Sequence, residues 1–403
     1  MMSGKKVLRK DYLKKLRGGK DVTHSVKVIT GMRRSGKSVL LEQFAEELRR
    51  SGVEDGRIIF IDLDSKKYED VEDFKDLNAV LESKISVKGR VYVFLDEVQK
   101  VEGWERTVNS LLTDYDADIY ISGSNAYLLS SELSTYLSGR YVEIEILPLS
   151  FKEYLELHPP DAVKNLDTRF AEYVHYGALP IIDPDAADKE FIYGQIEGVY
   201  NTVLVKDVQL RLKPKSIRDL EDVSKFMYSN IGNVTSISNI SAASRNAQAT
   251  VKSYVDALEM AYLFYRVRRF DIKGKKLLDS TEKYYASDTG IRNTVLNGGD
   301  ASDTGRLLEN VVFLELIRRG YKVTSGSYRD LEIDFTAKKG DRTEYYQVTE
   351  SMIRSGTAER EVRSLDCADD NYPKTVLSLD RMVTNPGKGI RHINLTDWLL
   401  GKD

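Results

Sequence analysis

The residues of Gly31–Ser38 have the types and spacing of a phosphate-binding loop. The run reads Gly-Met-Arg-Arg-Ser-Gly-Lys-Ser and matches the pattern G-x-x-x-x-G-K-[ST] in full. Its glycines let the backbone turn and let its N–H groups approach a phosphate without a Cβ in the way. We expect Lys37 to contact the β- and γ-phosphates and the Ser38 hydroxyl to bind Mg²⁺. The predicted nucleotide contacts are Gly31, Arg34, Ser35, Gly36, Lys37, Ser38 and Val39.

Two adjacent acids supply the second half of this expected site. The apolar run at 91–95 ends in Asp96 and Glu97, and a buried parallel strand brings acids to the carboxyl edge of a sheet in this way. Asp96 is predicted to hold Mg²⁺ opposite Ser38, and Glu97 to orient or deprotonate the water that attacks the γ-phosphate. The alternative is that both acids only end a strand and cap the next helix. A protein that merely carried nucleotide would not need the second carboxylate.

A third apolar run, at 118–122, predicts another central strand whose polar end reaches the same edge. Ser124 or Asn125 is the candidate sensor of the γ-phosphate. Arg140 could supply positive charge to a transferring phosphoryl group in the same or a neighbouring subunit, or it is an ordinary surface arginine. The predicted catalytic residues are Lys37, Glu97, Asn125 and Arg140.

The elements that must position these residues follow from the apolar pattern. Strands are expected at 26–30, 58–63, 91–96, 118–123 and 141–146, separated by helical patterns, which predicts a parallel three-layer α/β domain. The helix that begins near Ser38 would point its N-terminus at the phosphates. The predicted domains are a P-loop nucleotide domain at 1–155, a helical lid or connector at 156–215, a winged helix-turn-helix at 216–299 and an α/β nuclease-like domain at 300–403.

Composition limits the partners. The chain has 403 residues, with 60 basic and 63 acidic side chains and a formal charge of −3, so any contact with nucleic acid must come from local patches. One cysteine, Cys367, excludes a disulfide framework, and 4 scattered histidines make a zinc site unexpected. No apolar run approaches the roughly 18 residues of a membrane span, so we expect a cytoplasmic protein with no membrane partner.

The pattern of helices and strands after residue 215 predicts a second kind of module. Helices at about 216–230, 236–244 and 248–261, followed by two strands around Gly274, predict a winged helix-turn-helix. DNA is its expected partner; the alternative is a module that packs between domains and has a solvated wing. The candidate DNA contacts are Lys252, Arg266, Arg268, Arg269 and Lys273, with Lys275 and Lys276 beside them in the wing.

The last hundred residues have the skeleton of the PD-(D/E)XK nuclease fold. Asp334 and Gln347 stand at its two metal-binding positions, and Glu309 supports them from a preceding helix. Thr349 stands where that fold has a lysine, and a threonine can neither neutralise the developing phosphate charge nor activate water. We therefore expect an inactive, structural or DNA-docking version, with metal-dependent cleavage as the alternative.

Taken together, these residues resemble a widespread prokaryotic family of AAA-superfamily ATPases, in which the nucleotide domain is joined to a winged helix and a nuclease-like domain of unknown function. The resemblance implies ATP as the nucleotide, hydrolysis that drives a conformational switch or motor, self-association and a link to DNA. A regulatory ATPase that acts on protein partners is the alternative. The resemblance rests on Gly31–Ser38, Leu95–Gln99 with Trp104, Gly123–Asn125, Leu137–Arg140, Pro148–Phe151, Lys283–Gly290 and Leu308–Asn310.

Overall fold

The chain divides into two compact units in this computed structural model. The first comprises Met1–Pro148 with Met260–Tyr262, and the second comprises Leu149–Glu259 with Leu263–Asp403. Among the helices described, none is both long and apolar enough to cross a bilayer. The structure describes residues 6–85, 88–126, 137, 139–209, 212, 216–274, 276–298, 303–328, 331–353, 357–368, 370–382, 387 and 389–402.

The first unit is built on a five-stranded sheet of order β2-β3-β4-β1-β5. All neighbouring strands are parallel, which confirms the predicted α/β arrangement. Every residue of β1, β3 and β4 is buried, as expected for strands that are covered on both faces. The strands are β1 Val26–Thr30, β2 Ile58–Asp62, β3 Val91–Asp96, β4 Ala117–Ser122 and β5 Tyr141–Glu145.

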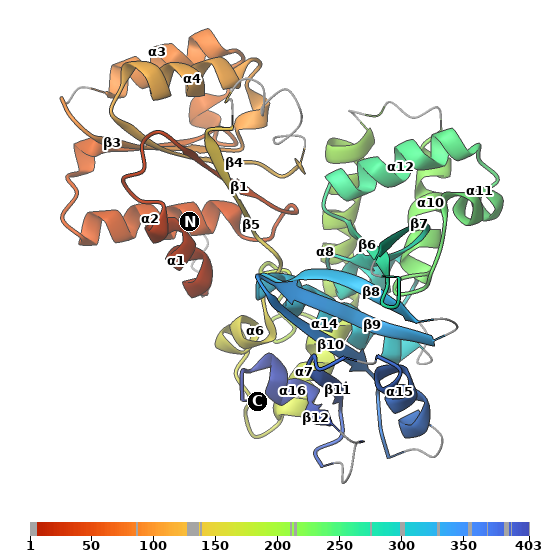
Figure 1. The fold of residues 1–403 in the computed structure, drawn as a ribbon. Helices are drawn as coiled ribbons and strands as arrows, with labels where there is room; N and C mark the ends of the chain where they lie inside the picture. Colours follow the sequence, from red (N-terminus) through yellow and green to blue (C-terminus); the bar gives the residue numbers. More distant parts are fainter. Residues whose placement is uncertain are drawn as a thin grey trace. The chain divides into compact units, whose positions relative to one another are not determined.

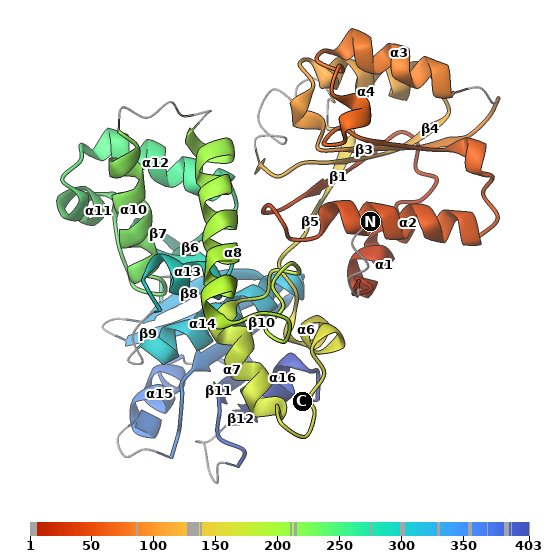
Figure 2. The ribbon, with the colours of Figure 1, turned by 180° about the vertical axis from the view of Figure 1, so that it is seen from behind.

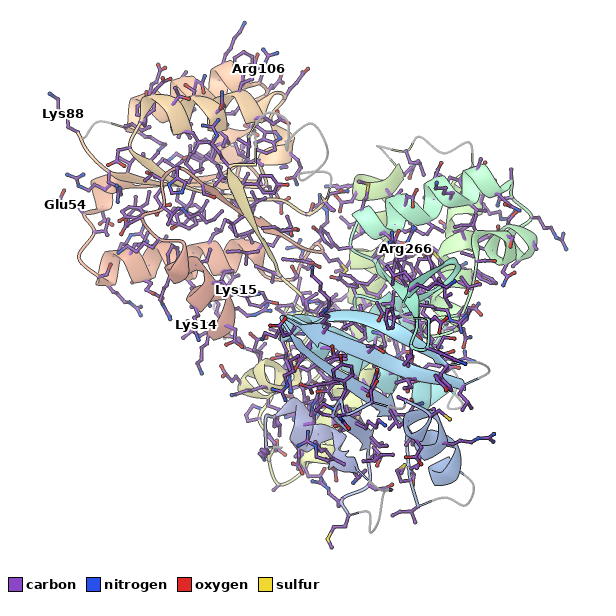
Figure 3. The ribbon with its side chains drawn as sticks, in the orientation of Figure 1. Lys14, Lys15, Glu54, Lys88, Arg106 and Arg266 are labelled. Atoms are coloured by element: carbon purple, nitrogen blue, oxygen red, sulfur yellow. The ribbon has the colours of Figure 1, made fainter. Side chains whose placement is uncertain are left out.

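Helices cover both faces of this sheet (Figure 1). Successive strand residues point to opposite faces, so Val28 packs in one apolar cluster and Ile29 in the other. Lys14 and Lys15 are exposed on the outer surface of α1 (Figure 3). Helices α1 Lys10–Gly18 and α2 Lys37–Arg50 lie on one face, and α3 Phe74–Lys84 and α4 Trp104–Asp114 on the other.

The second unit contains a seven-stranded sheet of order β12-β11-β10-β9-β8-β6-β7. The β6–β7 hairpin, predicted as the wing, continues this sheet because β6 pairs in parallel with β8. The sheet therefore crosses the boundary predicted at residues 299 and 300, and the first unit ends at Pro148, before the boundary predicted at residue 155. The strands are β6 Phe264–Asp271, β7 Lys276–Ala286, β8 Lys322–Tyr328, β9 Leu331–Lys339, β10 Arg342–Val348, β11 Lys374–Ser378 and β12 Ile390–Asn394.

The helices of the second unit follow the predicted order, with three helices before the hairpin. The winged-helix assignment itself stays a prediction. Figure 2 shows α7 and α8 in front of the seven-stranded sheet. The helices are α6 Phe151–Leu157, α7 Leu166–Tyr176, α8 Lys189–Thr202 with a π-helix at Val203–Gln209, α10 Ile217–Ser229, α11 Ile237–Ser244, α12 Gln248–Met260, α13 Thr289–Val295, α14 Thr304–Arg318, α15 Thr357–Asp366 and α16 Leu395–Leu399.

A buried carboxylate ties the end of α7 to the start of α13. Asp288 caps α13 by accepting a hydrogen bond from Ile291 N at 3.0 Å, and it accepts another from Ala178 N at 2.7 Å. Burial raises the pKa of Asp288 to about 6. Gly177 has a φ of 80°, and a Cβ there would lie 2.1 Å from Asp288 Oδ1. The junction therefore requires glycine for two reasons, its backbone conformation and its lack of a side chain.

Gly177→Ala is expected to lower the free energy of unfolding by about 2 kcal/mol or more, because it adds both a steric clash and a strained φ. Urea denaturation would measure the loss. Gly194→Ala is the matched control, since Gly194 lies within α8 with nothing within 4 Å of its added Cβ. That change should stabilise the chain by up to about 1 kcal/mol. Equal effects of the two substitutions would contradict the assignment.

Candidate functional site

The loop between β1 and α2 adopts backbone conformations that few residues allow. Gly31 and Gly36 have φ values of 130° and 101°, and Arg34 between them has a φ of 65°. A Cβ on Gly31 would lie 2.3 Å from the carbonyl oxygen of Ile146, so this position accepts only glycine. Helix α2 begins at Lys37, directly after Gly36, so its positive N-terminal end adjoins the loop. This arrangement suits an anion.

Lys37 is buried inside the loop. Its Nζ donates to the carbonyl oxygens of Gly31 and Met32, at 3.1 Å each, and lies 3.8 Å from Glu97 Oε1. The Ser35 hydroxyl is also buried, and it has no hydrogen-bond partner among the described residues. Both groups can therefore donate to phosphate oxygens at the position that the sequence predicts.

Asp96 ends β3 beside the loop and is almost fully buried. Its carboxylate accepts hydrogen bonds from the hydroxyls of Ser122 and Ser38. Burial, together with the charges of Glu97 and Asp62, raises the pKa of Asp96 to about 6 against the effect of those hydrogen bonds. Carboxylate and hydroxyl oxygens are ligands that Mg²⁺ prefers, and a cation here would offset the cost of burying the charge. Ser38 and Asp96 therefore fit a magnesium ion.

Glu97 occupies a strained backbone conformation at the same edge of the sheet. Its φ and ψ are 56° and 47°, a left-handed region that costs a non-glycine residue about 1 kcal/mol or more. The amide N–H donates to Ser122 Oγ at 3.1 Å, and the carboxylate accepts from Gln99 Nε2 at 2.5 Å. This backbone directs the carboxylate towards Lys37. Strain of this kind is typical of functional sites.

Ser124 and Asn125 follow β4 and are buried. Because β4 lies between β1 and β3, both residues reach the edge that carries the loop and the acids. Gln99 Nε2 lies 3.4 Å from Ser124 Oγ, which links the acid turn to the candidate sensor. Their role as sensors of the γ-phosphate stays a prediction.

Arg140 lies at the opposite edge of the sheet, contrary to one of its predicted roles. Its carbonyl oxygen accepts from Val26 N at 3.0 Å, at the start of β1, whereas the loop follows the end of β1 about 13 Å away. The guanidinium donates to Asn109 Oδ1 at 2.8 Å. The prediction that Arg140 acts in the site of its own subunit is therefore wrong. A role in a neighbouring subunit stays a prediction.

Arg9 is a contact of the loop that the sequence did not predict. This arginine is buried; Nη1 donates to Ser35 O at 3.0 Å and Nη2 to Leu147 O at 2.9 Å. Its guanidinium lies 4.7 Å from the ring centre of Tyr12, whose hydroxyl accepts from Leu147 N. Arg9 thus supports the loop from behind. In the sequence it is one of several basic residues near the N-terminus, and nothing distinguishes it from the others.

Arg266 is only partly exposed, and its guanidinium is surrounded by acids. It is a residue of β6 (Figure 3), and its Nη2 is 2.8 Å from Asp256 Oδ1 and 2.5 Å from Glu259 Oε2, both on α12. Its Nε also lies 3.6 Å from Glu282 Oε2. These acids neutralise its charge, and a contact between Arg266 and DNA stays a prediction.

The other predicted DNA contacts differ in exposure. Arg269 is partly buried and donates to the hydroxyls of Thr281 and Ser327. Lys252, Arg268, Lys273 and Lys276 are exposed, and Lys275 lies outside the described residues. The positive charge that could contact DNA is therefore on these exposed residues. Their role in binding DNA stays a prediction.

The second unit brings the predicted nuclease-like residues together around a lysine. Lys283 Nζ lies 3.0 Å from Glu309 Oε1 and also pairs with Glu332. Burial alone would lower the pKa of Lys283, but the charges of Glu309, Asp334 and Glu332 outweigh burial and raise it. Tyr285 donates to Glu309 at 2.5 Å. An ammonium group therefore occupies a place among these acids, where it would compete with a divalent cation.

Asp334 and Gln347 are engaged with the backbone. Gln347 Oε1 accepts from Asp334 N at 3.2 Å, and Asp334 Oδ2 accepts from Val348 N at 2.8 Å. A metal bound here would share both oxygens with these backbone donors. The geometry agrees better with the expected structural version of this module than with cleavage, which stays a prediction.

One further cluster has the composition of a metal site. His158, Asp183 and Asp185 approach one another within the described residues. Asp185 Oδ1, however, lies 2.7 Å from Lys164 Nζ and 2.9 Å from Arg169 Nη1. Burial would raise the pKa of Asp185, but its hydrogen bonds to Arg169 and Lys164 lower it. Because Asp185 already pairs with Lys164 and Arg169, we assign this cluster a structural role.

Comparison with known proteins identifies both units in part. Residues 23–155 match the family described as an AAA domain, and residues 167–302 match a domain of unknown function (DUF8612). An uncharacterized protein of Haemophilus influenzae is 38% identical over 407 residues, which covers 99% of this chain and 100% of that protein. Uncharacterized protein MJ1544 of Methanocaldococcus jannaschii is 29% identical over 97% of this chain and 88% of its own length.

A solved structure with weak similarity is that of the Aeropyrum pernix ORC1 protein in complex with DNA. It is 12% identical, with a TM-score of 0.31, and the match covers 73% of this chain and 93% of that chain. Similarity at this level supports no conclusion about fold or ligand. The AAA match, in contrast, contains both the phosphate-binding loop and the acid pair.

Asp96→Asn is expected to stabilise the protein, free of metal and nucleotide, by about 1–3 kcal/mol at pH 7. The folded-state pKa of Asp96 is about 6 and its usual value is 3.8, so the folded chain holds the extra proton between these values. Wild-type stability at this residue therefore falls as the pH rises from about 4 to about 6. Urea denaturation should show the advantage of the variant growing over that range. A pH-independent difference between the variant and the wild type would contradict the prediction.

Proposed function

Because the chain belongs to the same protein family as its full-length Haemophilus influenzae relative and carries an AAA domain, we propose that it binds Mg²⁺–ATP and hydrolyses it to ADP and phosphate. The observation that carries the proposal is the position of Glu97 Oε1, 3.8 Å from Lys37 Nζ inside the loop. Asp96, hydrogen-bonded to Ser38, lies next to that pair. The preference for ATP is proposed from the match of residues 23–155 to the AAA domain.

Each residue at this edge of the sheet has a separate role in the proposed reaction. The N-terminus of α2 and Lys37 bind the phosphates, and Lys37 exchanges its bonds to Gly31 and Met32 for phosphate oxygens. Ser38 and Asp96 hold Mg²⁺, which neutralises charge on the β- and γ-phosphates when bound. Glu97 accepts a proton from the water that attacks the γ-phosphorus.

We further propose that hydrolysis drives a conformational switch that is coupled to DNA. Exposed Lys252, Arg268 and Lys273 support this coupling, since surface cations bind phosphate by releasing counterions. Self-association is part of the proposal, because Arg140 at the far edge of its own sheet could reach a phosphoryl group only in another subunit. The single Cys367 agrees with a reducing cytoplasm.

A regulatory ATPase that acts on protein partners is the second candidate. The observation that favours it is Lys283, whose ammonium neutralises the acids that a nuclease would use for metal. The C-terminal module would then serve as a docking surface. Stimulation of turnover by DNA would favour the first candidate, and its absence would favour the second.

Glu97→Gln is expected to lower kcat by about 10²-fold or more with nucleotide affinity retained, because it removes the proton acceptor but keeps the side-chain shape. Lys37→Ala should instead lose nucleotide binding, because its ammonium contacts the phosphates directly. Phosphate release and the binding of a fluorescent ATP analogue would measure the two effects separately. Unchanged turnover in Glu97→Gln would show that the role assigned to this acid is wrong.

The double substitution Arg268→Glu and Lys273→Glu is expected to weaken duplex DNA binding by about tenfold or more and to reduce its salt dependence. Fluorescence anisotropy between about 50 and 200 mM salt would measure both quantities. Lys88→Glu, a single charge reversal on an exposed lysine of the first unit (Figure 3), is the control. Equal binding by the double variant and wild type, or no binding by wild type at low salt, would reject coupling to DNA through this hairpin.

A further inference from the structure

Gln99 is a polar residue beside the acid pair of the candidate nucleotide site. It lies in the short 3-10 turn Val98–Lys100 that follows the acid pair. Its Nε2 donates to Glu97 Oε2 at 2.5 Å and lies 3.4 Å from Ser124 Oγ. One amide group therefore connects the acid that takes the proton with the candidate sensor on the neighbouring strand.

The carbonyl oxygen of the same amide accepts no hydrogen bond from the described residues. Gln99 Oε1 is buried, and within the described part of the chain no donor reaches it. A buried acceptor without a donor costs free energy, and such groups in native proteins call for a functional explanation. The amide could avoid this cost by turning to solvent. The turn instead keeps its nitrogen on Glu97, which leaves the carbonyl oxygen at the site with one acceptor position to fill.

We propose that Gln99 positions the attacking water together with Glu97, its amide nitrogen holding the carboxylate and its amide oxygen accepting one hydrogen of the water once nucleotide is bound. This inference rests on the proposed hydrolysis. A water whose two hydrogens point at Glu97 and Gln99 directs an oxygen lone pair away from both, towards the γ-phosphorus. Fixing the water in this way supplies orientation, which a base alone does not.

In the proposed hydrolysis, every bond and proton is accounted for by the water, Glu97 and the nucleotide. The oxygen of the water forms a bond to the γ-phosphorus, and its proton passes to the carboxylate of Glu97. The bond between the γ-phosphorus and the β–γ bridging oxygen breaks, and its electron pair leaves with ADP. Gln99 gains and loses no proton. It acts through Glu97 and the water, so it is a positioning residue.

The test compares ATP turnover of the full chain with and without the amide. Gln99→Met keeps the length of the side chain but removes both hydrogen-bonding groups. It is expected to lower kcat by about 10- to 100-fold and to change KM, and the affinity for a fluorescent ATP analogue, by less than about threefold. Gln195→Leu, on a half-buried glutamine of α8, is the matched control and should leave kcat unchanged. An unaltered kcat in Gln99→Met would overturn the proposal.

A double-mutant cycle distinguishes positioning from a structural role. Because Gln99 acts in part through Glu97, Gln99→Met should lower turnover by a smaller factor in a Glu97→Gln background than in the wild type, as measured with radiolabelled ATP. Equal losses in the two backgrounds would overturn the proposal. Gln99→Glu gives a second route if Gln99→Met misfolds, because a carboxylate cannot donate to Glu97 and kcat should again fall. Wild-type kcat in that variant would overturn the proposal.

The outcomes for the two proposals differ. Absence of turnover in wild-type chain that binds nucleotide would remove the proposed hydrolysis and this inference with it. If turnover requires Glu97 but is unchanged by Gln99→Met, only the role proposed for Gln99 is wrong.

Discussion

The close approach of Gly31 to the carbonyl oxygen of Ile146 is the contact on which the nucleotide site depends. A Cβ at that position would lie 2.3 Å from the oxygen, so the chain can pass from β1 into the loop only through a glycine. The same contact holds the loop against the segment that leaves β5. The N-terminus of α2, Lys37 and the acids of β3 then meet at one edge, because parallel strands deliver their carboxyl ends together.

The sequence predicted this part of the molecule well because its signals are local. Five strands, their parallel arrangement and the loop-to-helix junction follow from apolar runs and glycine spacing, and the structure confirms them. The error at Arg140 has a topological cause. A residue that precedes a parallel strand lies at the amino edge, away from the phosphates, and the predicted strand order along the chain already contained that information.

The second unit was harder to predict because its contacts join residues far apart in sequence. The charge of Arg266 is neutralised by Asp256 and Glu259 of α12, and no local pattern showed that pairing. Lys283 reaches Glu309 from a strand of the predicted wing, which the sequence placed in another domain. Gln99 and Lys283 both belong to the segments that carry the family resemblance, but resemblance alone assigned them no role.

The candidate nucleotide site has several energetic costs in a small volume. Glu97 holds a left-handed backbone, Asp96 is a buried acid, and no donor among the described residues reaches the buried carbonyl oxygen of Gln99. A ligand that binds only the folded site would offset these costs, so by mass action the folded population of this unit would rise with the ligand concentration. If ATP is that ligand, as proposed, the first unit would open more often and meet proteases more often in a cell depleted of ATP, and the abundance of the protein would follow the energy charge.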